Sequence, residues 1–137
     1  MIRKSLGTGV VVSALAALSL AACDPVEQVD ARAMYLVNCA ACHGPDGKGD
    51  GPLAADLDPR PADLTRIAAR NDGVFDFAAV MAVIDGYNAP ERDMPRFSDM
   101  LAEADVMFLD TGDGVMTPTP VPLVALARYI ESIQVGQ

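Results

Sequence analysis

The sequence CAACHGPDGKGDGP, residues 39–52, contains two of the three cysteines of the chain, its only histidine and four of its eleven glycines. Cys39 and Cys42 are three residues apart, a spacing that places two side chains on the same side of a helical turn. His43 follows the second cysteine directly. Because thiols and imidazole serve as ligands and as redox groups, this stretch is the candidate functional site of the protein.

Three uses of a Cys-x-x-Cys pair differ in what surrounds it. A redox dithiol is typical of a βαβ setting with its first cysteine at a helix N-terminus, whereas Cys39 comes at the end of a predicted helix. A structural zinc ion needs four ligands, and with a single histidine one ligand would have to be an aspartate. The third use requires a histidine after the second cysteine: the thiols form thioethers with the vinyl groups of a haem, and the imidazole binds the iron. We therefore expect one covalently attached haem c, held by Cys39 and Cys42, with His43 as the proximal ligand.

The pattern of apolar residues predicts short helices joined by long loops in a single domain of 137 residues. Asp30 is a suitable N-cap for the helix that leads to the cysteines. Glycine, proline and aspartate dominate residues 44–61, which indicates a long loop of the kind that wraps a ligand. No strand pattern and no internal repeat is found, so we expect an all-α fold of four or five short helices. Helices are predicted at residues 30–40, 61–70, 75–86, 98–107 and 123–133.

These features resemble the class I c-type cytochromes over most of residues 30–134. The first helix carries a small residue and an aromatic residue ahead of the cysteines, and the last helix carries two side chains that resemble their packing partners. These residues are Ala31 and Tyr35 on the first helix, and Leu126 and Tyr129 on the last. The resemblance implies the cytochrome c fold, in which the first and last helices cross closely and the chain wraps around one haem.

The same resemblance implies a backbone partner for His43. Pro61 is similar in position to the proline whose carbonyl accepts the Nδ1–H of the proximal histidine. Such a contact orients the imidazole ring and tunes the iron. Pro59 is the alternative acceptor.

The sixth iron ligand follows from the residue types that remain. A single histidine excludes two histidine ligands from within the chain, which leaves a methionine thioether as the soft ligand. Met94 precedes Pro95 in an irregular segment and matches the Met-Pro pattern of the family, while Met116, in a second predicted loop, is the rival. Met81 is predicted to belong to the core. Ligation by histidine and methionine leaves no open position on the iron, which favours one-electron transfer over small-molecule chemistry.

Residues 1–23 read MIRKSLGTGVVVSALAALSLAAC. A basic start, an apolar stretch at residues 6–20 and small residues ahead of Cys23 are typical of an export signal. The ending LAAC resembles the lipobox of bacterial lipoproteins, which implies cleavage before Cys23 and lipidation of that residue. Lipidation would account for the odd cysteine. The alternatives are an uncleaved membrane helix and a plain cleavage site with an incidental cysteine.

The predicted organisation is a lipoprotein signal peptide at residues 1–22, a lipid-anchored leader at 23–29 and a cytochrome c domain at 30–137. An extended leader of seven residues spans at most about 25 Å, so the domain is expected to stay close to the bilayer. Residues 103–122 look longer than the link that precedes the last helix in the family. We interpret them as an insertion that either packs on the core or forms a docking surface.

The chain is strongly acidic, with 10 basic and 19 acidic residues and a net charge of −9. Removal of the signal peptide would take away two basic residues and lower the net charge to −11. Nucleic acid and anionic lipid are poor partners for such a surface. A basic face on a redox partner protein is a better match, although acidity can also serve solubility alone.

These observations predict an electron carrier and not an enzyme. The expected protein is a lipid-anchored, single-haem cytochrome on the periplasmic face of the bacterial inner membrane, passing electrons between protein partners. Asp24, directly after the predicted lipidated cysteine, resembles the signal that retains lipoproteins in this membrane in some bacteria. The first alternative is an electron-transfer subunit of an exported dehydrogenase or reductase, and the second is a haem gas sensor.

Overall fold

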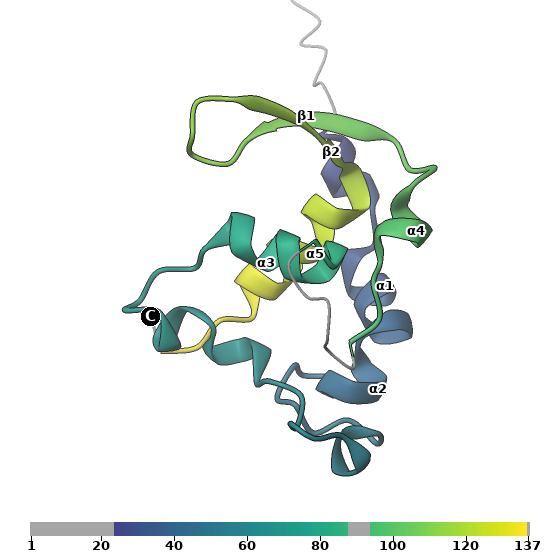
Figure 1. Ribbon diagram of the computed structural model, residues 1–137, viewed down its shortest axis with the longest axis vertical. Coiled ribbons are helices and arrows are strands. Elements are labelled where there is room, and N and C mark those ends of the chain that lie inside the picture. Colours follow the sequence, from purple (N-terminus) through teal and green to yellow (C-terminus); the bar gives the residue numbers. More distant parts are fainter. Residues whose placement is uncertain (1–23, 88–93, 137) are drawn as a thin grey trace, which may run out of the picture.

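The computed structural model describes residues 24–87 and 94–136, in which the helices enclose one apolar core (Figure 1). Helix α5, Val121–Ser132, packs against both α1, Ala31–Asn38, and α3, Phe77–Asp85. The fold is mostly α-helical, as predicted from the sequence. None of the helices in the described residues has the length and apolar character that spanning a bilayer requires.

Helix α1 begins where the sequence predicts and ends earlier. The Asp30 side chain accepts a hydrogen bond of 2.8 Å from the backbone N–H three residues later. The Asn38 side chain donates to the Met34 carbonyl at 2.8 Å, which gives that carbonyl a side-chain donor at the end of the helix. Cys39 then has φ −118°, and a separate turn, α2, spans Ala40–His43. The prediction of one helix running through the first cysteine is therefore wrong at its C-terminal end.

Helices α1 and α5 cross closely, as the resemblance implied. The rings of Tyr35 and Tyr129 lie 5.1 Å apart between centroids, with an angle of 46° between their planes. Leu126 and Ala127 of α5 are almost completely buried. A small residue such as alanine allows two helix backbones to approach closely. This crossing is the structural support for the turn that carries the cysteines.

Helix α3 has a local signal at each end. The Asp76 side chain accepts a hydrogen bond from the backbone N–H of the third residue of the helix, at 2.9 Å. Gly86 ends the helix in the left-handed region, with φ 87°, a conformation that glycine adopts at little cost. Met81 and Ile84 are buried, which confirms Met81 as a core residue.

Two other predicted helices are much shorter than expected. The segment at residues 61–70 forms two 3-10 turns, and the segment at 98–107 forms only a single turn. Proline and repeated glycine or aspartate nearby limit the length over which a helix can propagate. The short elements are η2 (Ala54–Asp56), η3 (Leu64–Arg66), η4 (Ala68–Arg70) and α4 (Ser98–Leu101).

Residues 103–122, predicted to contain no strand, include a β-hairpin. Strand β1, Val106–Asp110, pairs antiparallel with β2, Met116–Pro120, and Phe108 lies opposite Pro118. The all-α prediction is therefore wrong in this segment. Two prolines in β2 argued against a strand, but a two-stranded sheet has only edge strands, where proline is tolerated.

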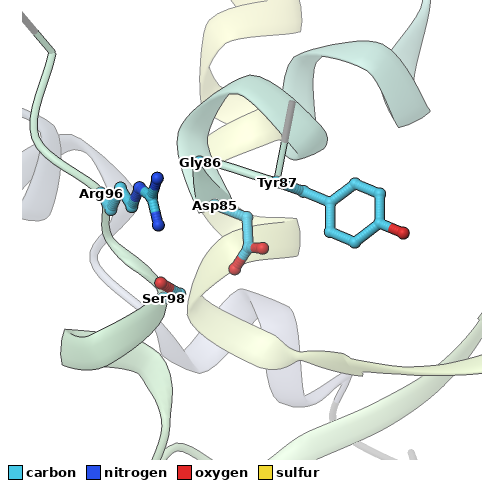
Figure 2. A pocket seen from close by; sticks show the side chains of 5 residues that line it. All are labelled: Asp85, Gly86, Tyr87, Arg96 and Ser98. Carbon is cyan, nitrogen blue, oxygen red and sulfur yellow. The ribbon is translucent and has the colours of Figure 1, made fainter. Parts of the chain in front are cut away.

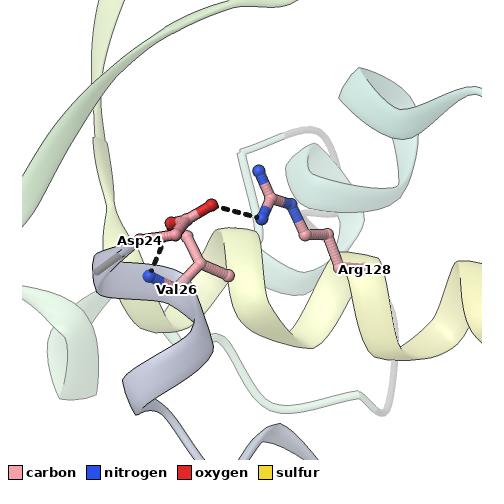
Figure 3. Close-up of polar contacts among 3 residues, drawn as sticks. All are labelled: Asp24, Val26 and Arg128. Carbon is pink, nitrogen blue, oxygen red and sulfur yellow. Dashed lines mark hydrogen bonds and ion pairs between the residues drawn. The ribbon is translucent and has the colours of Figure 1, made fainter. Parts of the chain in front are cut away.

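The residues predicted as a leader are folded against α5 (Figure 3). Residues Pro25–Gln28 form the 3-10 turn η1, and Val26 is buried in the core. Asp24 accepts a hydrogen bond of 2.9 Å from the Val26 N–H and forms an ion pair of 3.2 Å with Arg128. The folded part of the chain therefore includes residues 24–29, ahead of the predicted domain start at residue 30. Cys23 and the predicted signal peptide lie outside the described residues.

Candidate functional site

Cys39 joins α1 to α2, and the short turn α2 carries Cys42 and His43. The N–H groups of Cys42 and His43 both donate to the Cys39 carbonyl, at 3.2 and 2.9 Å. This arrangement closes one helical turn around the motif. Both thiols are half-buried and unpaired, with no disulfide between them. Two free thiols are what two thioether bonds require.

The electrostatics of the first cysteine differ from those of a redox dithiol. Burial raises the pKa of Cys39 to about 11, with a further contribution from the nearby Cys42 thiol. Reactive redox cysteines have the opposite property, a pKa lowered by a helix N-terminus or a cationic neighbour. No group of three or more His, Cys, Asp or Glu side chains in the described part of the chain is arranged to hold a metal ion. Neither a redox dithiol nor a zinc site is supported by this geometry.

The imidazole of His43 is oriented by a backbone carbonyl. Its Nδ1 lies 3.0 Å from the carbonyl oxygen of Ala62. Because a carbonyl oxygen can only accept, Nδ1 carries the proton, and Nε2 keeps a lone pair for an iron ion. The half-buried imidazole thus has the tautomer of an axial haem ligand.

The sequence predicts the Pro61 carbonyl as the acceptor of the His43 Nδ1–H. The structure places the carbonyl of the next residue, Ala62, in this position. The Pro61 carbonyl faces the Gly49 backbone instead, where a Cβ would meet it. The Leu64 N–H donates to the Gly47 carbonyl at 2.6 Å and ties this segment to the glycine loop. A backbone acceptor carries no residue signature, so the sequence offered no signal that would distinguish Ala62 from its neighbour.

The glycine loop folds back onto the motif through backbone hydrogen bonds. The N–H of Gly49 donates to the His43 carbonyl at 2.8 Å, and the N–H of Gly51 donates to the Cys42 carbonyl at 3.1 Å. The buried Tyr35 hydroxyl donates to the Gly44 carbonyl at 2.7 Å, and burial raises its pKa. These contacts hold the backbone of the motif from the loop and from α1 at once.

In the sequence from His43 to Met94, several large apolar side chains are only half-buried, although they pack against the core. Apolar surface left partly open in a small domain is a site for a further apolar group. Cys39 packs against the same core, and the donor set of two thiols and one imidazole fits haem, a flat and largely apolar cofactor. The side chains are Leu64, Ile67, Phe75, Phe77 and Val80.

The two candidate methionine ligands lie in different surroundings. Met94 is half-buried and packs against the core, in the segment that enters α4. Met116 is the first residue of β2, and its side chain is 58% exposed. In Figure 1 the hairpin lies at the opposite end of the fold from α2.

A small polar hollow lies where the segment after Met94 meets the end of α3 (Figure 2). Its volume is about 320 Å³. Phe97 N–H donates to the Ile84 carbonyl at 3.3 Å beside it, which fixes this segment to α3. The polar lining of this hollow does not suit the apolar face of a porphyrin. The hollow is therefore not a candidate for the haem site. The lining residues, missed in the sequence, are Asp85, Gly86, Tyr87, Arg96 and Ser98.

A mostly helical fold with two unpaired thiols and an imidazole on one turn defines a protein that binds haem covalently. The chain belongs to the cytochrome c family: the sequence model of the family described as Cytochrome c matches residues 28–110. Its cofactor is accordingly covalently attached haem c, and its chemistry is haem-based electron transfer. The match ends at the last residue of β1, so β2 and α5 lie beyond it. Neither the curated proteins nor the solved structures gave a match to the chain.

Proposed function

We propose that the chain is a class I cytochrome c that carries single electrons between partner proteins at the periplasmic face of a bacterial inner membrane. Cys39 and Cys42 hold the haem through thioethers, and the axial ligands are His43 and Met94. A lipid on Cys23 anchors the protein. The observation that carries the proposed haem site is the 3.0 Å contact between His43 Nδ1 and the Ala62 carbonyl, because it leaves Nε2 for the iron.

The residues around the motif suit a carrier that changes charge without rearranging. The haem supplies a centre that gains or loses one electron. His43 is held from the Ala62 carbonyl, and its own carbonyl accepts from the glycine loop. A sulfur ligand from Met94 would raise the reduction potential relative to a second imidazole. With both axial positions filled by side chains of this chain, outer-sphere electron exchange is the remaining chemistry.

The folded leader refines the predicted tether. Cys23 directly precedes Asp24, which is fixed to α5 through Arg128. Hydrogen bonding from Val26 and the Arg128 guanidinium lower the pKa of Asp24, so its carboxylate stays ionised at neutral pH. The anchor would therefore join the folded domain directly, without the seven-residue spacer expected from the sequence. A directly joined anchor supports a fixed relay beside the membrane over a free-ranging shuttle.

The choice of methionine is tested by the absorption spectra of purified holoprotein. We expect Met94→Ala to lose the methionine-to-iron charge-transfer band of the oxidised protein and to bind carbon monoxide when reduced, because an axial position opens. We expect Met116→Ala, an exposed position, to keep the wild-type spectrum. The reverse pattern would assign the ligand to Met116, and carbon monoxide binding by the reduced wild type would favour the gas sensor.

The anchor is tested by cell fractionation of wild type and Cys23→Ala. We expect the wild type in the inner-membrane fraction and Cys23→Ala in the soluble periplasmic fraction, with an unchanged haem spectrum. Acyl chains contribute about 0.8 kcal/mol per buried CH₂, so their loss is expected to release the domain from the bilayer. Retention of Cys23→Ala in the membrane would point to an uncleaved N-terminal helix. A soluble wild type would contradict lipidation.

A further inference from the structure

The β-hairpin has one face on the core and one apolar face that nothing in the described chain covers. Met107 and Leu109 pack against the core, and Thr119 of the partner strand is buried. Side chains alternate between the two faces of a strand, so the residues between them point outward. Val106 is 58% exposed and Phe108 is 63% exposed.

Exposed apolar side chains are concentrated on this hairpin. Of the ten large apolar residues that are exposed in the described chain, four lie within residues 106–116. Single exposed apolar residues are common on protein surfaces, whereas a contiguous group marks an interaction site. The hairpin's outer face is defined here by Val106, Phe108, Met116 and Pro118.

The charged residues of the hairpin segment are all acidic. Residues 103–122 contain four acidic residues and no lysine or arginine. The N–H groups of Gly112 and Gly114 donate to Asp110 at 2.8 and 3.0 Å and lower the pKa of its carboxyl group. An apolar centre with a charged rim is the usual anatomy of a protein interface. The acidic residues are Glu103, Asp105, Asp110 and Asp113.

This charge pattern favours one kind of binding partner for the hairpin's outer face over the others. A second copy of the chain would bring the same four carboxylates against the first set, and like charges across an interface are repulsive. Pro118 and Pro120 also remove two N–H donors from β2, which hinders edge-to-edge strand pairing. A bilayer with anionic lipids would repel the carboxylates as well. A protein surface with lysine or arginine around an apolar patch matches both the centre and the rim.

We propose that the hairpin's outer face attaches this cytochrome to a protein partner whose apolar patch is bordered by lysine or arginine. The hairpin and the turn with Cys39 and His43 lie at opposite ends of the fold in Figure 1. Docking through the hairpin therefore leaves the motif end accessible to a second protein for electron exchange. The inference rests on the proposed function as an electron carrier. It makes the protein a stably bound subunit of a complex.

The test begins with a photo-crosslinking amino acid at position 108 of the full-length protein in its native cell. The control carries the same group at Val74, which is 59% exposed and lies outside the hairpin. The protein that crosslinks only from position 108 is then purified, and its affinity for detergent-solubilised holocytochrome is measured at low and high salt. We expect Val106→Thr with Phe108→Thr to weaken binding at least about tenfold, because truncating two central apolar residues costs about 1 kcal/mol or more each.

Threonine is β-branched and favoured in strands, so this variant is expected to retain the hairpin. Val74→Thr is the matched control for binding. Binding is also expected to weaken with salt. Crosslinks from position 108 to phospholipid or to a second copy would overturn the proposal, as would a purified partner that binds the double variant as tightly as wild type. Reduction by dithionite and the haem spectrum report separately on the proposed electron carrier, so the two hypotheses can fail independently.

Discussion

Replacing His43 with alanine is expected to remove proximal ligation and with it the six-coordinate haem spectrum. The chain has no other histidine, so no residue of the same type can take over. The thioethers of Cys39 and Cys42 would still hold the haem, so the expected change is in the ligation of the iron and not in its retention. The measurement is the absorption spectrum of covalently loaded protein, with haem-stained denaturing gels as the record of attachment.

Added imidazole separates a ligand role of His43 from a purely structural one. Alanine leaves the space of the ring empty beside the Ala62 carbonyl, where free imidazole can donate the same hydrogen bond. We expect imidazole to restore the six-coordinate spectrum of His43→Ala. Lys48→Ala, an exposed change in the same loop, should behave as wild type throughout. An unchanged spectrum of His43→Ala without imidazole would remove this residue from the iron.

The parts of the fold that could be predicted from sequence are those with local signals. Asp30 and Asp76 cap helices through side chains that reach N–H groups three residues away. Gly86 ends α3 because glycine readily adopts a positive φ. The cysteine and histidine spacing acts within a single turn and needs no tertiary contact to be recognised. Signals of this kind are complete within a few residues.

The hairpin and the folded leader depend on contacts between distant segments, which a local pattern does not show. The sequence of β1, VMFLD, has four apolar residues in a row and shows no alternation, although their burial alternates, and β2 contains prolines that suggest no strand. In the leader, Val26 and Val29 stand among polar residues, and the burial of Val26 depends on α5, about a hundred residues later. The role of Ala62 also depends on a contact with a distant residue, because its backbone carbonyl is the acceptor for His43.

Replacing Gly51 with alanine is expected to destabilise the site strongly, through contact with the backbone of α2. A Cβ at this position would contact the carbonyl oxygens of Ala40 and Ala41 and lie 2.6 Å from the carbonyl carbon of Ala41. These atoms belong to the backbone of α2, which cannot rotate away as a flexible side chain can. The Gly51 N–H also donates to the Cys42 carbonyl, so a shift of the loop would break that bond. We expect a loss of about 3 kcal/mol in the free energy of unfolding.

The variant Gly73→Ala controls for the conformational effect of replacing a glycine. Gly73 has φ 83° and no atom within 4 Å of a Cβ, so alanine there is strained without a steric contact. Left-handed backbone costs a non-glycine residue about 1–2 kcal/mol. Denaturant unfolding of both holoproteins, together with haem yield per polypeptide, measures the difference. If Gly51→Ala were no less stable than Gly73→Ala, the close packing of the loop on α2 could not be what holds Cys42 and His43 in place.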